Sequence, residues 1–180
     1  SAQPTGPQKL LAIARESSAD IYGGTAVTPE AAATFCAWHN AITAGMEGDA
    51  SASLKQLRPH VHDKCIFRPP TYFKPWEGGD EMLVLLGCVG DVFGTSFTYG
   101  RQWLSDDGHQ WALEFKADVA KTGKMVDGID LVTLDAEGKM TDFTVLARPP
   151  NAVEELKKQM MMRVPLKLAA LKAKQALGFA

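Results

Sequence analysis

The sequence has little cysteine, no long apolar run and no large excess of charge of either sign, and each absence excludes a class of protein. Its three cysteines, Cys36, Cys65 and Cys88, are an odd number and lie far apart among apolar neighbours. This excludes a disulfide framework and a paired-cysteine metal motif, and predicts free, buried thiols. No run approaches the ~20 apolar residues that span a membrane. A net charge of -2 argues against generic nucleic-acid binding.

The composition is that of an ordinary globular domain. With 46% hydrophobic and 22% charged residues, a chain of 180 residues is long enough to build one domain around one core. Residues 1–7 lack the charged and apolar zones of a signal peptide, so we expect a cytoplasmic location. Export stays open, because a chain that begins without Met can have lost an upstream segment.

Helical patterns dominate the first half of the chain. Thr28 suits an N-cap and Pro29 a first helical turn, and apolar residues then recur at steps of three and four as far as Met46. Pro59 ends a further short helix. The expected elements are helices near residues 10–14, 28–46, 54–57 and 82–93, and a strand at residues 61–67 that runs into Pro69-Pro70.

The second half changes its apolar period from about 3.6 to 2, which indicates a sheet. Residues 111–119 alternate between apolar and polar side chains, as a strand with one dry face does. Residues 125–134 are apolar on both parities, as in a central strand that is covered on both sides. Helices followed by antiparallel strands predict an α+β domain. The four expected strands are residues 97–103, 111–119, 125–134 and 140–146.

The last 30 residues form a basic tail. Residues 151–180 carry six Lys or Arg against two acids, and Leu156, Met160 and Leu168 belong to an apolar stripe along them. We expect a helix that Asn151 caps and Pro165 divides. A helix that packs on its own domain or on a second subunit is favoured over one that contacts a membrane.

Several short strings occur in a fixed order between residues 28 and 150. They are Phe35-Cys-Ala-Trp38-His39, Gly48-Asp49, Cys65-Ile-Phe67-Arg-Pro69-Pro70, Gly78-Gly79, Asp127-Gly-Ile-Asp130-Leu, Asp135-Ala-Glu-Gly138-Lys-Met and Arg148-Pro149. In this order they resemble the nuclear transport factor 2-like superfamily, in particular its polyketide-cyclase-like and ketosteroid-isomerase-like branches.

The resemblance implies a cone-shaped domain of residues 28–150, in which a curved mixed or antiparallel sheet wraps over N-terminal helices and encloses an apolar cavity. Residues 1–27 would be an N-terminal extension, and residues 151–180 a helical extension of the same domain. A homodimer through the outer face of the sheet is also implied. Some relatives bind small apolar molecules, some catalyse proton transfer, dehydration or cyclisation, and others are interaction modules, so the fold does not fix the function.

Asp130 is the leading candidate for a functional residue. It lies between Ile129 and Leu131 in the most apolar strand, where an unpaired charge is costly and the pKa of a carboxyl group tends to rise. The resemblance implies that Asp130 matches the acid of ketosteroid isomerase that binds the oxyanion. The alternative is a structural carboxylate that Arg101, Arg148 or a backbone donor satisfies.

The other acid/base positions of the isomerase have no direct counterpart. Pro69 occupies the place of its general base, and Trp38 approximately that of its helix tyrosine. His39 is the best available replacement base, the alternative being a histidine at the surface or on the helix rim. His60 and His62 lack a third ligand, so we expect no metal and no cofactor.

Four aromatic residues are expected to form the cavity mouth, although core or interface packing is an equal alternative. They are Trp38, Phe67, Tyr72 and Trp76. Tyr99 and Arg101 share a strand face, so they either line the cavity together or point into the dimer interface.

The expected ligand is small, apolar or aromatic, and bears oxygen. The expected chemistry is a cofactor-free acid/base reaction on its carbonyl group. A non-enzymatic dimeric interaction module is the alternative function.

Overall fold

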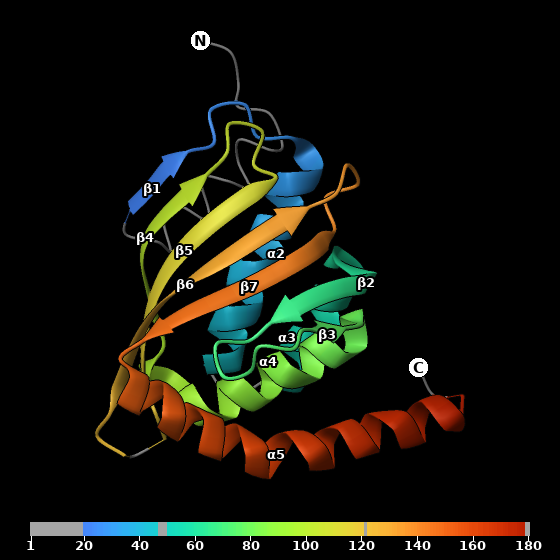
Figure 1. The fold of residues 1–180 in the computed structure, drawn as a ribbon. Helices are drawn as coiled ribbons and strands as arrows, with labels where there is room; N and C mark the ends of the chain where they lie inside the picture. Colours follow the sequence, from blue (N-terminus) through green and yellow to red (C-terminus); the bar gives the residue numbers. More distant parts are fainter. Residues whose placement is uncertain (1–19, 47–49, 121, 179–180) are drawn as a thin grey trace.

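A curved sheet of seven strands, covered on its inner face by helices, makes up the computed structural model (Figure 1). The structure describes residues 20–46, 50–120 and 122–178. In chain order the elements are β1 (Asp20–Gly23), α2 (Pro29–Met46), α3 (Ala50–Leu57), β2 (Val61–Arg68), β3 (Trp76–Glu77), α4 (Gly79–Phe93), β4 (Thr98–Leu104), β5 (Gln110–Asp118), β6 (Met125–Leu134), β7 (Met140–Arg148) and α5 (Pro150–Ala176).

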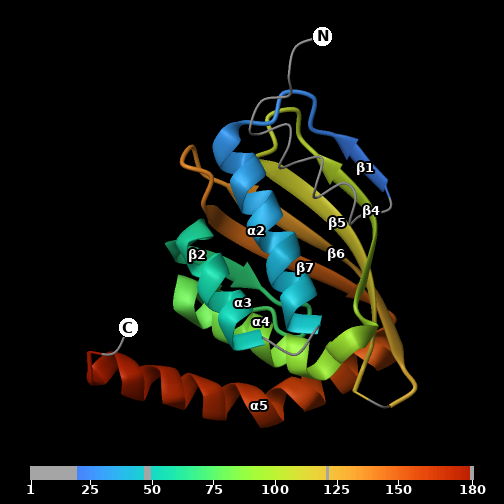
Figure 2. The same cartoon turned by 180° about the vertical axis from the view of Figure 1, so that it is seen from behind.

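The strands lie in the order β1-β4-β5-β6-β7-β2-β3. Strands β4 to β7 form an antiparallel meander, whereas β1 pairs parallel to β4 and β2 pairs parallel to β7. Figure 2 shows α2 crossing the inner face of the sheet, with α3 and α4 beside it and α5 running past α4. The predicted α+β class, with a curved mixed sheet wrapped over helices, is therefore confirmed.

Helix α2 follows from its own sequence. The Thr28 side chain accepts a hydrogen bond from the backbone N–H of Ala31 at 3.3 Å, as an N-cap does, and Pro29 opens the first turn. Phe35 and Trp38 are buried on the face that meets the sheet. At its start the helix touches Gly138, whose φ of +77° and proximity to the backbone of Glu30 leave no room for a Cβ atom.

Strand β4 contains a bulge that the sequence pattern does not reveal. Its register with β5 shifts between Tyr99 and Gln102, which inserts an extra residue and reverses the faces of the residues that follow. Tyr99 points inward, whereas Arg101 and Trp103 point outward and Gln102 is fully buried. The prediction that Tyr99 and Arg101 share a face is wrong.

Helix α5 runs without interruption through Pro165, so the predicted division of the tail is wrong. A proline removes one backbone N–H from the helix, but apolar residues on both sides of it, Met160 and Leu168, hold the same face against the domain. The N-cap is Pro149, not Asn151. An ion pair between Lys167 and Asp91 also ties the helix to α4.

Two strands were not predicted, because β1 and β3 are too short to show alternation. The helix expected near residues 10–14 lies outside the described residues. The remaining expected helices and strands form where predicted, and all three cysteines are buried and outside any disulfide. In the part of the chain that the structure describes, no helix combines the length and apolar character needed to cross a membrane.

Candidate functional site

A cavity of about 1180 Å³ lies between the inner face of the sheet and the helices. Its wall comes from α2, α3, α4, α5, strands β2, β3, β5, β6 and β7, and the loop that follows β2. Most of the lining is apolar; the polar or charged side chains in it, besides the tryptophans, are Ser53, Thr71, Tyr72, Lys74, Glu77, Asp130 and Lys172. Of the ionisable groups among these, Asp130 alone is buried, with 5% of its surface exposed.

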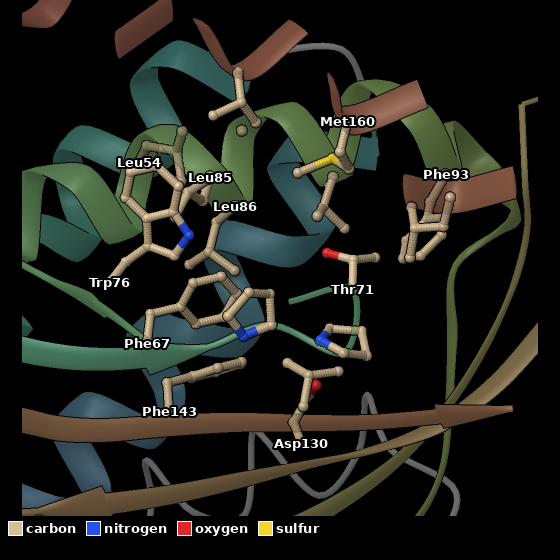
Figure 3. A pocket seen from close by; sticks show the side chains of 18 of the residues that line it. Leu54, Phe67, Thr71, Trp76, Leu85, Leu86, Phe93, Asp130, Phe143 and Met160 are labelled. Atoms are coloured by element: carbon tan, nitrogen blue, oxygen red, sulfur yellow. The ribbon is translucent and has the colours of Figure 1, made fainter. Parts of the chain in front are cut away.

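Asp130 lies on the sheet side of the cavity, below Thr71 in Figure 3 and across from Leu86 and Met160 on the helix side. Gly128, two residues before Asp130 on β6, leaves room for the ring of Phe115. A Cβ atom at Gly128 would come within 2.3 Å of the ring of Phe115, so only glycine lets that ring lie against β6. The floor of the cavity is therefore apolar around a single carboxyl group.

A hydrogen-bonded chain of three side chains ends at Asp130. The indole Nε1–H of Trp38 donates to the hydroxyl oxygen of Tyr99 at 2.7 Å, and the Tyr99 hydroxyl lies 3.4 Å from Oδ2 of Asp130, to which it donates. The three residues come from α2, β4 and β6, so only the folded sheet and helix bring them together.

Burial raises the pKa of Asp130 to about 8, although the hydrogen bond from Tyr99 opposes the rise. Burial and the nearby Asp130 also raise the pKa of Tyr99 well above its usual value. Both side chains therefore hold their protons at neutral pH. A protonated carboxylic acid in an apolar wall can donate a hydrogen bond to a ligand oxygen.

Neither Arg101 nor Arg148 contacts Asp130. Arg101 forms a two-pronged ion pair with Glu114, at 2.8 and 2.9 Å, on the outer face of the sheet. Arg148 lies 3.4 Å from Asp127, on the outer face of the sheet. Arg101 is accordingly not a cavity residue, and the structural partner of Asp130 is a tyrosine.

The four aromatic residues expected at the cavity, Trp38, Phe67, Tyr72 and Trp76, all line it. Trp38 and Phe67 are buried, and both pack against Phe143. Tyr72 is 42% exposed and carries the Lys157 ammonium 5.4 Å from its ring centre. The aromatic lining thus agrees with the prediction, whereas α5 contributes to the cavity wall without having been predicted there.

His39 lies in the core behind Tyr99 and does not line the cavity. Its Nδ1 is 2.9 Å from the Phe35 carbonyl oxygen, and its Nε2 is 2.9 Å from the side-chain oxygen Oε1 of Gln102. Burial lowers its pKa, which favours a neutral ring. A neutral ring that donates from Nδ1 must accept at Nε2, so the Gln102 amide has to be turned to present its N–H, instead of Oε1, to the ring. His39 is neither at the cavity nor at the surface.

His60 and His62 each take part in a hydrogen bond through Nδ1. The Thr34 hydroxyl donates to the Gly138 carbonyl at 2.6 Å, so His60 Nδ1, at 2.8 Å, donates to Thr34 in turn. The Nδ1 of His62 accepts from the Lys64 backbone N–H. No group of three metal-ligating side chains occurs among residues 20–46, 50–120 and 122–178.

Comparison with solved structures identifies relatives of the whole fold. A steroid delta-isomerase from Pseudomonas aeruginosa is 33% identical, with a TM-score of 0.69; the match covers 79% of this chain and 97% of that protein. An uncharacterized protein conserved in bacteria, with a cystatin-like fold, from Silicibacter pomeroyi is also 33% identical, with a TM-score of 0.63 and coverage of 78% and 93%.

A more distant likeness supports the fold alone. An NTF2-like protein of unknown function from Exiguobacterium is 16% identical, with a TM-score of 0.50 over 64% of this chain and 98% of that protein. Neither a family model nor a curated protein matches the sequence. The two relatives at 33% identity, each matched over nearly its full length, carry the assignment. The chain belongs to the nuclear transport factor 2-like superfamily.

Proposed function

We propose that this protein binds a small, apolar, oxygen-bearing molecule in the cavity, with the ligand oxygen accepting a hydrogen bond from Asp130. The observation that carries the proposal is one buried, protonated carboxyl group in an otherwise apolar wall. A buried polar group that faces an apolar space is costly unless a partner satisfies it. A ketone or another strong acceptor oxygen is the partner that a protonated acid requires.

The size of the cavity supports an aromatic or polycyclic ligand. Its volume of about 1180 Å³ exceeds the roughly 300–1,000 Å³ of typical small-molecule sites. Trp38, Phe67 and Phe143 present ring faces and edges near Asp130, and flat apolar ligands pack well against such surfaces. An interaction module whose interior is filled by its own side chains fits a cavity of this size less well.

Fluorescence titration with prodan, a naphthyl ketone whose emission reports hydrogen bonding to its carbonyl oxygen, tests the proposal. We expect saturable binding with a dissociation constant of about 1–100 μM, as an apolar ligand with one hydrogen bond can reach. The matched hydrocarbon, 2-propylnaphthalene, has the same ring and carbon chain but no carbonyl or amino group, and should bind about tenfold more weakly. Equal affinity for the ketone and the hydrocarbon would contradict the role of Asp130, and binding of neither would contradict the cavity function.

A second candidate function is a cofactor-free acid/base reaction on a ketone. It is supported by the similarity to a steroid delta-isomerase and by the protonated carboxyl group of Asp130, which could donate to an enolate while it accepts a hydrogen bond from Tyr99. A proton-accepting base is also needed, and Pro69 stands where the resemblance would place it. Conversion of a β,γ-unsaturated ketone to its conjugated isomer, followed by ultraviolet absorbance, would establish this activity; binding without turnover would exclude it for that substrate.

We also propose a homodimer through the outer face of the sheet. Exposed apolar side chains lie on this face. Trp103 on β4 is 36% exposed and Leu131 on β6 is 39% exposed, with Ala112 of β5 paired to both, and Leu146 on β7 is 59% exposed. Such a row favours burial against a second copy. Light scattering should give the mass of a dimer for the wild type and of a monomer for Leu131→Glu, with prodan binding retained. A monomeric wild type at micromolar concentration would contradict this proposal.

A further inference from the structure

We propose that Trp38 fixes the direction of hydrogen bonding at the polar end of the cavity, and so makes the site selective for ligands with an acceptor oxygen. This inference rests on the proposed function, because it concerns the same cavity. It assigns Trp38 as a positioning residue that acts through Tyr99 and Asp130, in addition to its contribution to the apolar lining.

The chemistry of the indole group sets the direction. An indole N–H can only donate a hydrogen bond, and Trp38 Nε1 lies 2.7 Å from the Tyr99 hydroxyl oxygen with 2% of the tryptophan exposed. The Tyr99 oxygen must therefore accept, which leaves its own proton to be donated elsewhere. The acceptor is Oδ2 of Asp130, at 3.4 Å.

The proton of Asp130 then has one place to go. Because Oδ2 accepts from Tyr99, the acid proton of the carboxyl group resides on Oδ1, where it can be donated into the cavity. In this series of hydrogen bonds Trp38 donates to Tyr99, Tyr99 donates to Asp130, and Asp130 donates to the ligand. A ligand whose only polar group is an N–H donor cannot accept the acid proton on Oδ1, which would then lack a partner.

The neighbours of Asp130 on the adjacent strands do not compete for the same protons. Strands β5 and β7 place Leu113 and Val145 opposite Asp130 in the sheet, and both side chains are aliphatic. The ring of His39 lies 5.4 Å from that of Tyr99, but both of its nitrogens are engaged, with Phe35 and Gln102. Among the residues that the structure describes, Tyr99 is the titratable group that hydrogen-bonds to Asp130.

Replacing Trp38 with phenylalanine tests the inference, with Trp111→Phe as a matched control. Trp111 is also buried, at 3% exposure, but its indole N–H donates to the Gly108 carbonyl and its ring lies outside the cavity. Trp38→Phe should weaken prodan binding threefold to tenfold relative to the matched hydrocarbon, the effect of one uncharged hydrogen bond. The emission of bound prodan should shift to the blue. Trp111→Phe should leave the ketone-to-hydrocarbon ratio unchanged.

The outcomes separate this inference from the proposed function. If Trp38→Phe weakens the ketone and the hydrocarbon equally, Trp38 only packs against the ligand; the inference is then wrong and the proposed function stands. If prodan does not bind the wild type, the proposed function fails.

A measurement on the ligand-free wild type tests the inference even if prodan does not bind or if the Trp38→Phe variant does not fold. The nitrogen-15 and proton resonances of the Trp38 indole N–H should titrate together with Asp130 near pH 8, because the charge of that carboxylate polarises the chain. The titration should vanish in Asp130→Asn. A Trp38 resonance that does not change between about pH 6 and about pH 10, while Asp130 ionises, would overturn the inference.

Discussion

Replacing Asp130 with leucine is expected to lower the affinity of the cavity for prodan by about tenfold to 100-fold. Leucine has nearly the shape of aspartic acid but cannot donate a hydrogen bond, so the ligand oxygen would be buried against an apolar wall without a partner. Affinity for the matched hydrocarbon should stay within about twofold of the wild type or increase. Fluorescence titration of both probes against both proteins gives the comparison.

Asparagine at the same position separates donation from ionisation. The side-chain amide of Asp130→Asn can still donate an N–H to a ketone but does not titrate. Prodan affinity of the wild type should fall as the pH rises through about 8, where Asp130 loses its proton, whereas that of the asparagine variant should stay level. A leucine variant that binds prodan as tightly as the wild type, or a wild type whose affinity ignores pH, would show that Asp130 does not hold the ligand.

The stability of the protein is expected to depend on pH through the same carboxyl group. Its pKa in the folded state, about 8, is above the value of about 3.9 that an exposed aspartate has in the unfolded chain. Between these two values the folded state keeps a proton that the unfolded state releases. Stability therefore falls as the pH rises across this range, by at most ~1.4 kcal/mol per pH unit, and levels off above it.

Asp130→Asn should remove this dependence. Relative to the wild type, the free energy of unfolding of the variant should rise by roughly 3 kcal/mol between pH ~5 and pH ~8. Urea unfolding at several pH values measures both proteins, and all other titrating groups, His39 included, cancel in the difference. Parallel stability curves for wild type and variant would mean that Asp130 is ionised in the folded protein at neutral pH.

The elements with a strong local period could be predicted from the sequence. Helix α2 carries an N-cap and a regular apolar face, and β5 alternates over nine residues, so local preference and burial agree in both. The apolar neighbours of Asp130 likewise predicted that its carboxyl group is buried. What could not be predicted is the partner of that group, because it depends on the bulge in β4. One inserted residue decides that Tyr99 faces inward and Arg101 outward.

The error over His39 has a different physical origin. Consecutive residues of a helix point about 100° apart, so a residue next to Trp38 in sequence does not share its contacts. His39 turns toward Gln102, which the same bulge in β4 brings into the core. The role of α5 was missed because its stripe of apolar residues predicts a packed face but not what that face encloses. In the structure Met160 and Leu168 close one side of the cavity.

A crystal structure of the protein with bound prodan tests the central claim most directly. We expect the naphthyl ring to lie in the cavity against Trp38 and Phe143, with the carbonyl oxygen within about 2.5–3.0 Å of Oδ1 of Asp130. The Tyr99 hydroxyl should remain on the other carboxyl oxygen. A ketone oxygen that points to the cavity mouth near Lys172, away from Asp130, would contradict the account.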